Sequence, residues 1–138
     1  MSFLLDTNVL SEARKPAGDA SVKAWLASVR GAELYLSVLV VGEIRQGIER
    51  LRRRDTAQAA VFEAWLTALN REYAERILPV TAAIAEEWGR LNVPDPVPVI
   101  DGLLAATARV HGFVLVTRNT ADLSRTGVRL LNPFLPGR

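Results

Sequence analysis

Short apolar segments alternate with longer helix-like segments along this chain of 138 residues. The short segments are rich in residues that favour strands, and they are bounded by polar or turn-forming residues. They lie at residues 2–5, 33–38, 113–118 and 127–132, with a weaker one at 76–80. Strands that alternate with helices favour an α/β sandwich with a mainly parallel sheet. In such a sheet, ligand sites gather at the carboxyl ends of the strands.

The segments between these strands have the apolar spacing or composition of helices. They cover residues 39–53, 56–74, 81–91 and 100–112. The predicted inner face of the first one consists of Val41, Ile44, Ile48 and Leu51. Asp55 is placed to cap the second helix, and the pair reads as a helical hairpin. Prolines at 94, 96 and 98 favour an extended connection before the last helix, and Gly112 is a typical residue at a helix C-terminus.

Composition narrows the possible classes of protein. Hydrophobic residues make up 49% and charged residues 23%, as in a globular chain, and the length fits one domain over residues 1–138. The absence of cysteine excludes disulfides, thiolate catalysis and cysteine-ligated zinc. No signal peptide and no membrane-spanning run is legible, so we expect a cytoplasmic protein that does not enter a membrane. Most of the cations are arginines, which suit anionic partners.

Four carboxylates occupy positions that can meet at one edge of a parallel sheet. Asp6 follows the first strand, Glu43 lies early in the helix after the second, Asp101 lies in the first turn after the prolines, and Asp122 follows strand 113–118. Each also has a purely structural interpretation. Asp6 can cap a helix, Glu43 can be a solvated helix residue, and Asp122 can stabilise a turn.

Two observations favour a functional role over a purely structural one for Glu43 and Asp101. Gly47 lies one turn beyond Glu43, and glycine inside a helix costs about 1 kcal/mol relative to alanine, so something there needs room. Asp101 shares a face with Ala105 and Ala108, and such small residues indicate that this side of the helix is closely packed. The helix dipole favours an acid in the first turn, but it does not explain why the acid lies on a closely packed face.

A cluster of these carboxylates would need a cation. Two carboxylates ~4 Å apart repel each other by about 4 kcal/mol at an effective dielectric constant of 20. An oxygen-rich site in a chain without cysteine and with one histidine favours Mg²⁺, or Mn²⁺ in its place. Such an ion can activate water and neutralise charge during phosphodiester hydrolysis.

Three segments resemble the PIN-domain ribonucleases, and among them the VapC-type toxins of type II toxin–antitoxin pairs. They are "LLDTNVLSE" at 4–12, "LSVLVVGEIRQGI" at 36–48 and "IDGLLAATARVHGFVLVTRNTADL" at 100–123. The resemblance covers nearly the whole chain. It implies a PIN-like three-layer α/β/α sandwich with a central parallel sheet, and a Mg²⁺-dependent endoribonuclease site. One departure is Leu123, where many members have phenylalanine, and it concerns packing rather than chemistry.

The resemblance also assigns roles to residues. Asp6, Glu43, Asp101 and Asp122 match the acids of the family, with Asp6 and Asp101 as the most direct metal ligands. The polar positions that can hold water or phosphate are Thr7, Asn8, Thr117 and Asn119. The implied partners are an RNA substrate, a cognate antitoxin that lays a peptide across the site, and a second copy of the chain in a homodimer. Promoter DNA would be bound through the antitoxin complex.

Other conspicuous residues have two interpretations each. The arginines between Arg50 and Arg54 suit a solvated helix end, an RNA contact or an antitoxin contact equally well. His111, the single histidine, is placed for helix capping rather than catalysis. The three tryptophans have helical spacing and are expected in packing; they are Trp25, Trp65 and Trp88.

Two further functions compete with a ribonuclease. The fold could serve as a nucleic-acid-binding or antitoxin-binding module with little turnover, although four retained acids argue against this. An aspartate after the first strand also occurs in phosphoacceptor and phosphatase folds, but a chain whose only lysines are Lys15 and Lys23 fits those poorly.

Overall fold

The computed structural model describes residues 1–136, and within them five parallel strands form one sheet. The order across the sheet is β3-β2-β1-β4-β5. The strands are β1 (Phe3–Leu5), β2 (Leu34–Ser37), β3 (Ile77–Leu78), β4 (Val114–Val116) and β5 (Leu130–Leu131). All five lie in the segments predicted as strands, including the weakest one.

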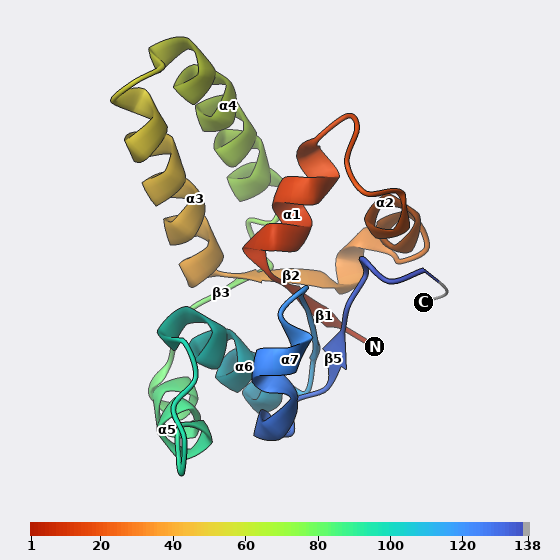
Figure 1. The fold of residues 1–138 in the computed structure, drawn as a ribbon, viewed down its shortest axis with the longest axis vertical. Helices are drawn as coiled ribbons and strands as arrows, with labels where there is room; N and C mark the ends of the chain where they lie inside the picture. Colours follow the sequence, from red (N-terminus) through yellow and green to blue (C-terminus); the bar gives the residue numbers. More distant parts are fainter. Residues whose placement is uncertain (137–138) are drawn as a thin grey trace.

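Helices cover both faces of this sheet (Figure 1). On one side are α1 (Thr7–Arg14), α2 (Ala20–Ala27), α3 (Val38–Arg52) and α4 (Thr56–Glu72). On the other side are α5 (Ala82–Leu91), α6 (Val99–His111) and α7 (Thr120–Leu123). Single 3-10 turns lie at Gly31–Glu33 and Ser124–Thr126. The predicted three-layer α/β/α sandwich with a parallel sheet is confirmed.

The central strands are apolar on both faces because helices cover both. Leu4, Leu5, Leu36, Leu115 and Val116 are fully buried. Burial of such side chains contributes about 1.5–3 kcal/mol each and is the main force that holds the layers together. Among the described residues, no helix is long and apolar enough to cross a membrane.

Helices α3 and α4 form the predicted hairpin, which projects from the rest of the molecule (Figure 1). Asp55 caps α4 by accepting a hydrogen bond from the backbone N–H of Gln58 at 3.0 Å, as predicted. On α3 the buried face is formed by Val40, Ile44 and Ile48. The predicted inner residues are confirmed, since Val41 and Leu51 are partly buried and pack against the same core, and Val40 joins them as a fully buried residue that the apolar spacing did not include.

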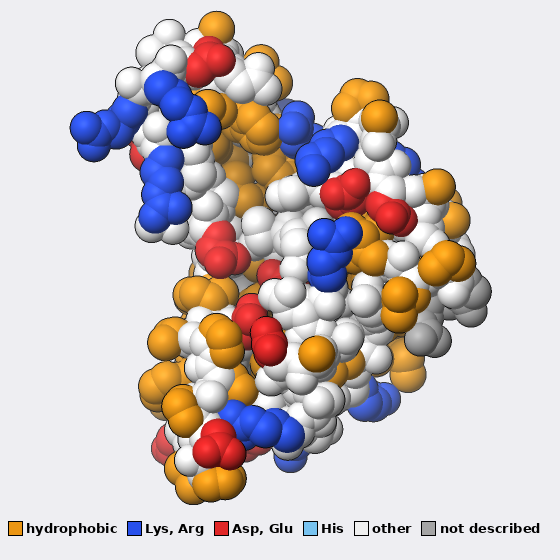
Figure 2. All heavy atoms as spheres, viewed as in Figure 1, with side chains coloured by type: hydrophobic (Ala, Val, Ile, Leu, Met, Phe, Trp, Pro, Cys, Tyr) orange, Lys and Arg blue, Asp and Glu red, His pale blue; other side chains and the backbone are white. Residues whose placement is uncertain are grey.

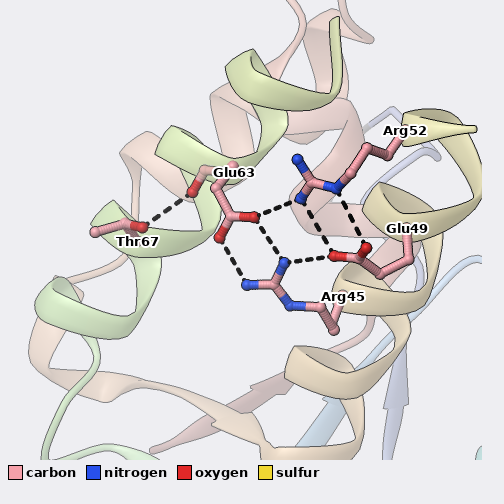
Figure 3. Close-up of polar contacts among 5 residues, drawn as sticks. All are labelled: Arg45, Glu49, Arg52, Glu63 and Thr67. Carbon is pink, nitrogen blue, oxygen red and sulfur yellow. Dashed lines mark hydrogen bonds and ion pairs between the residues drawn. The ribbon is translucent and has the colours of Figure 1, made fainter. Parts of the chain in front are cut away.

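Charged side chains on the outer surface join the two arms of the hairpin (Figure 3). Arg45 binds Glu63 through two hydrogen bonds of 2.7 and 2.6 Å, and it also contacts Glu49. Arg52, which lies about two turns after Arg45 on α3, binds both glutamates. These partners raise the pKa of Arg45 and lower the pKa of Glu63 to about 2. The network links the two helices across their exposed surface.

On the other side of the sheet, α5 packs closely against α6. Gly102 makes this possible, because a Cβ atom there would lie 2.8 Å from Val97 Cγ2 and 3.1 Å from Trp88 Cδ1. Helix α6 ends at Gly112, whose φ of 72° lies in the left-handed region, as the sequence predicted. The close packing fixes the position of α6 and of Asp101 in its first turn.

Candidate functional site

Asp6 stands at the junction of β1 and α1, and it is a capping residue as well as a buried carboxylate. Its Oδ1 accepts a hydrogen bond from the backbone N–H of Thr7 at 2.6 Å. Its Oδ2 accepts one from Thr117 Oγ1 at 2.7 Å and a longer one from Asn8 Nδ2 at 3.4 Å. The side chain is only 5% exposed. Burial raises the pKa of Asp6, and the bonds from Thr117 and Thr7 partly oppose this effect.

The topology of the sheet explains why Asp6 and Thr117 meet. From β1 the chain proceeds to β2 and β3 on one side, whereas β4 and β5 lie on the other side of β1. Strands β1 and β4 therefore flank a topological switch point, where parallel α/β sheets form ligand crevices at the carboxyl ends of the strands. Asp6 follows β1, and Thr117 follows β4.

Glu43 reaches the same edge from the second turn of α3. Ser37 caps this helix through a hydrogen bond of 3.0 Å from the backbone N–H of Leu39 to its Oγ. Glu43 Oε1 then accepts a hydrogen bond of 2.6 Å from Thr7 Oγ1. Glu43 is half-buried and held from a different helix, so it is not an ordinary solvated residue.

Asp101 comes from the opposite layer, in the first turn of α6. Ala105 and Ala108, which share its face, are fully buried, in agreement with the sequence prediction. Burial raises the pKa of Asp101, and so do the negative charges of the three other acids, Asp6, Glu43 and Asp122. The side chain of Asn119 acts in the opposite direction. Asp6, Glu43 and Asp122 therefore all lie close enough to Asp101 to act on it electrostatically.

Asp122 is the most exposed of the four. It lies in the short helix α7, which Leu123 anchors in the core. Asn119 occupies the N-cap position of α7 but makes no side-chain capping bond there, and its backbone N–H donates to Thr117 Oγ1 at 3.0 Å. The four predicted polar residues thus lie around the acids: Thr7 contacts Glu43, Asn8 and Thr117 contact Asp6, and Asn119 lies beside Asp101.

The charge of this acidic cluster, defined as Asp6, Glu43, Asp101 and Asp122, is not balanced by arginine or lysine. Within residues 1–136, all ion pairs that meet the distance criterion involve other acids. In Figure 2, acidic side chains gather near the middle of the molecule, between the α3–α4 hairpin and the α5–α6 pair. A divalent cation would relieve this accumulation of negative charge.

The spacing of the acids limits how such an ion could be held. Among the described residues, no three Asp, Glu or His side chains converge closely enough to coordinate one ion together. Mg²⁺ usually takes one or two protein carboxylates and keeps several of its waters. The donor set therefore suits a hydrated divalent cation, with some acids acting through water, rather than a cage made only of protein oxygens.

An apolar groove adjoins the acidic cluster, and the sequence analysis did not predict it. Its volume is about 340 Å³, and it shares Thr7 and Glu43 with the site. The remaining lining residues come from α1, the α3–α4 hairpin and its connection: Ser11, Ile44, Gly47, Ile48, Leu51, Arg54, Phe62 and Trp65. A Cβ atom at Gly47 would meet nothing within 4 Å. The room expected at Gly47 therefore belongs to this groove and not to packing within the chain.

The structure also locates arginines of the 50–54 segment, two of the tryptophans and His111. Arg54 lines the groove, whereas Arg52 belongs to the ion-pair network of the hairpin. Trp25 is buried in the core, while Trp65 lines the groove beside Glu43, so packing does not account for all of its surface. His111 ends α6, at the opposite end from Asp101.

A family comparison supports the fold and the order of these segments. The model of the family described as PIN domain matches residues 3–128, which is most of the chain. The matched range contains all four acids and the polar residues around them.

Individual relatives match over nearly their full length. The chain is 33% identical to VapC ribonuclease Y4jK of Sinorhizobium fredii over 142 residues, covering 97% of this chain and 99% of the relative. It is 30% identical to toxin FitB of Neisseria gonorrhoeae over 140 residues, covering 96% and 98%. Its structure matches a chain of FitAB bound to an IR36 DNA fragment with a TM-score of 0.89 at 30% identity, covering 99% and 98%.

Proposed function

The chain belongs to the PIN-domain family, and on this premise we propose that it is a metal-dependent endoribonuclease, the toxin of a type II toxin–antitoxin pair. The observation that carries the proposal is the acidic cluster, in which Asp6, Glu43 and Asp122 all lie close enough to act on Asp101, with no ion pair to a cation among the described residues. The names of the relatives, a VapC ribonuclease and a toxin, point to the same activity. We propose that residues 1–138 act as a single PIN domain in the cytoplasm.

In this proposal Asp6 and Asp101 bind Mg²⁺ or Mn²⁺ directly, and Glu43 and Asp122 hold its waters. When bound, such an ion supplies positive charge to a phosphate oxygen and activates water for attack. The protein keeps the carboxylates in position: Thr117 and Asn8 hold Asp6, and Thr7 holds Glu43. Asn119 lies beside Asp101, where its amide can orient water or phosphate. In this proposal the attacking group is water, and no side chain forms a covalent bond to the phosphate.

A cognate antitoxin is the proposed protein partner. Solved complexes of related chains carry the names of paired proteins, FitAB and VapBC, some with DNA. The apolar groove beside Glu43 offers a surface on which an antitoxin segment could bury apolar side chains and block access to the acids. We further propose a homodimer, and binding of promoter DNA only through the antitoxin complex.

The decisive experiment is cleavage of RNA by the purified protein with and without divalent metal. We expect cleavage with Mg²⁺ or Mn²⁺, loss of cleavage in EDTA, and a fall of at least a hundredfold in Asp101→Asn. The matched control is Asp95→Asn, which changes an exposed aspartate outside the cluster and should retain wild-type activity. Tight RNA binding without cleavage under any divalent metal would instead support a binding module with little turnover.

A further inference from the structure

Arg118 lies between two residues of the site, Thr117 and Asn119, at the end of β4. Its backbone is tied to the acidic cluster, because its N–H donates to Asn8 Oδ1 at 3.4 Å and the preceding Thr117 donates to Asp6 Oδ2 at 2.7 Å. The position of its Cα atom is therefore fixed relative to Asp6. None of the roles assigned above uses its side chain.

The guanidinium group of Arg118 is stacked on an aromatic ring. Its central carbon lies 3.8 Å from the centre of the Phe134 ring. Phe134 is half-buried, and its backbone N–H is bound to Asn132 Oδ1 at 3.0 Å, so the ring is itself held in place. Stacking uses the flat face of a guanidinium and leaves the N–H groups at its edge available. Phe134 thus orients a cation whose donors remain accessible.

No acid of the described residues pairs with this side chain. Residues 1–136 contain neither a hydrogen bond from the Arg118 guanidinium nor an ion pair with it. Glu12 is a carboxylate near enough to respond to it. The pKa of Glu12 is lowered mainly by the backbone N–H of Asp19, and to a smaller extent by Lys15 and Arg118. Because Glu12 already binds Asp19 and Lys15, the fork of Arg118 is left for a ligand.

We propose that Arg118, oriented by Phe134, binds a phosphate of the RNA backbone next to the one that is cleaved. This inference rests on the proposed ribonuclease function and adds a substrate-binding residue to it. A chain of phosphates that approaches four carboxylates is repelled, and an ion at the acids neutralises charge only at the scissile group. Basic side chains beside the acidic ones are visible on this face of the molecule (Figure 2). Arginine is suited to phosphate because its fork forms paired hydrogen bonds.

An acidic peptide could also bind a guanidinium, but the location favours RNA. The backbone of Arg118 is bonded to Asn8, and Asn8 contacts the buried carboxylate of Asp6. A strand whose scissile phosphate lies at Asp6 and which passes over the end of β4 brings a neighbouring phosphate to Arg118. The groove at Glu43, in contrast, does not include Arg118 among its lining residues.

The test compares Arg118→Gln, Arg118→Lys and Phe134→Leu with Arg30→Gln. Arg30 is a suitable control because its side chain is 84% exposed and it precedes β2, at the opposite edge of the sheet from the acids. Cleavage of a single-stranded RNA oligonucleotide is measured as kcat and KM at several salt concentrations. Binding of the same oligonucleotide, labelled with a fluorophore, is measured in an Asp101→Asn background, and melting curves check that each variant folds.

We expect Arg118→Gln to raise KM and the dissociation constant for RNA about tenfold, with kcat changed less than threefold. The plot of log affinity against log salt has a negative slope, and this slope should become shallower by about 0.7, the value for one phosphate contact on a single strand. Arg118→Lys should keep this slope with an intermediate affinity, because it retains the charge but not the fork. Phe134→Leu should weaken RNA binding in the same direction, and Arg30→Gln should match wild type.

Wild-type RNA affinity and salt slope in Arg118→Gln would overturn the inference, and so would a loss of kcat at unchanged KM. Unchanged RNA binding together with weaker binding of an antitoxin would assign Arg118 to the protein partner and equally overturn it. If wild type binds RNA but cleaves none with Mg²⁺ or Mn²⁺, the proposed function fails while the binding comparison still decides the role of Arg118. If wild type neither binds nor cleaves RNA, both proposals fail.

Discussion

Thr7 Oγ1 donates a hydrogen bond of 2.6 Å to Glu43 Oε1, which joins the first turn of α1 to α3. The backbone N–H of the same residue donates to Asp6 Oδ1 at 2.6 Å. Thr7 therefore holds two carboxylates of the acidic cluster, one through its backbone and one through its hydroxyl. Loss of its hydroxyl removes the contact with Glu43 and leaves the backbone bond to Asp6 in place.

We predict that Thr7→Val lowers kcat for RNA cleavage about tenfold, because Glu43 loses the donor that fixes its carboxylate. The loss of a hydrogen bond to a charged group costs about 1.5–3 kcal/mol. Thr7→Ser keeps the hydroxyl and should stay within about threefold of wild type. Equal activity of Thr7→Val and wild type would show that the orientation of Glu43 does not matter for the reaction.

Asp101 gives a prediction about stability and pH. Its pKa is raised above 3.8 in the folded protein, so the folded state binds more protons than the unfolded state between 3.8 and the raised pKa. Stability therefore falls as the pH rises through this interval, and the ionised carboxylate destabilises the fold at neutral pH. Asp101→Asn should raise the melting temperature at pH 7 without metal, and this gain should shrink toward pH 4. Asp95→Asn serves as the control, and a melting temperature of Asp101→Asn below that of wild type at pH 7 would contradict the prediction.

A substitution at Gly102 tests whether the close packing of α5 against α6 positions Asp101. Gly102→Ala would bring a Cβ atom to 2.8 Å from Val97 Cγ2, so we expect a loss of about 1–3 kcal/mol in the free energy of unfolding. Gly89→Ala is a matched control in the exposed part of α5, where a Cβ atom meets nothing within 4 Å. The control should be neutral or stabilising, by up to about 1 kcal/mol. Urea denaturation measures both, and equal stability of the two variants would contradict the close contact of α5 and α6.

The ion pairs of the α3–α4 hairpin should matter mainly at low salt. Glu63→Gln removes the carboxylate that Arg45 and Arg52 share, and Glu75→Gln removes an exposed carboxylate that makes no ion pair within residues 1–136. We expect a lower melting temperature for Glu63→Gln in low salt and a difference that disappears in 1 M salt, where charges are screened within about 3 Å. A difference that persists in high salt would indicate lost packing rather than lost ion pairing.

The sequence was sufficient for the five strands and for helices α3 to α6, because strand and helix periods are local properties. All five strands lie in predicted segments, and the caps Asp55 and Gly112 are where the sequence placed them. The full burial of Val40 beside Val41 on α3 follows from where Ser37 begins the helix, which apolar spacing alone does not determine.

The acids could be chosen from their positions at strand and helix junctions, but the contacts that hold them could not. The bond from Thr7 to Glu43, the bond from Thr117 to Asp6 and the stacking of Arg118 on Phe134 each join segments that are distant in sequence. Such contacts depend on the order of strands in the sheet and on side-chain rotamers. Their amino acids carry no local pattern that pairs one with the other.

Calorimetric titration with Mn²⁺ or Mg²⁺ shows whether the acidic cluster binds a divalent cation. We expect a saturable site in the wild-type protein, an affinity at least tenfold weaker in Asp101→Asn, and wild-type affinity in Asp95→Asn. Equal metal affinity in all three proteins would contradict this expectation, because the ion would then be bound elsewhere or not specifically bound at all.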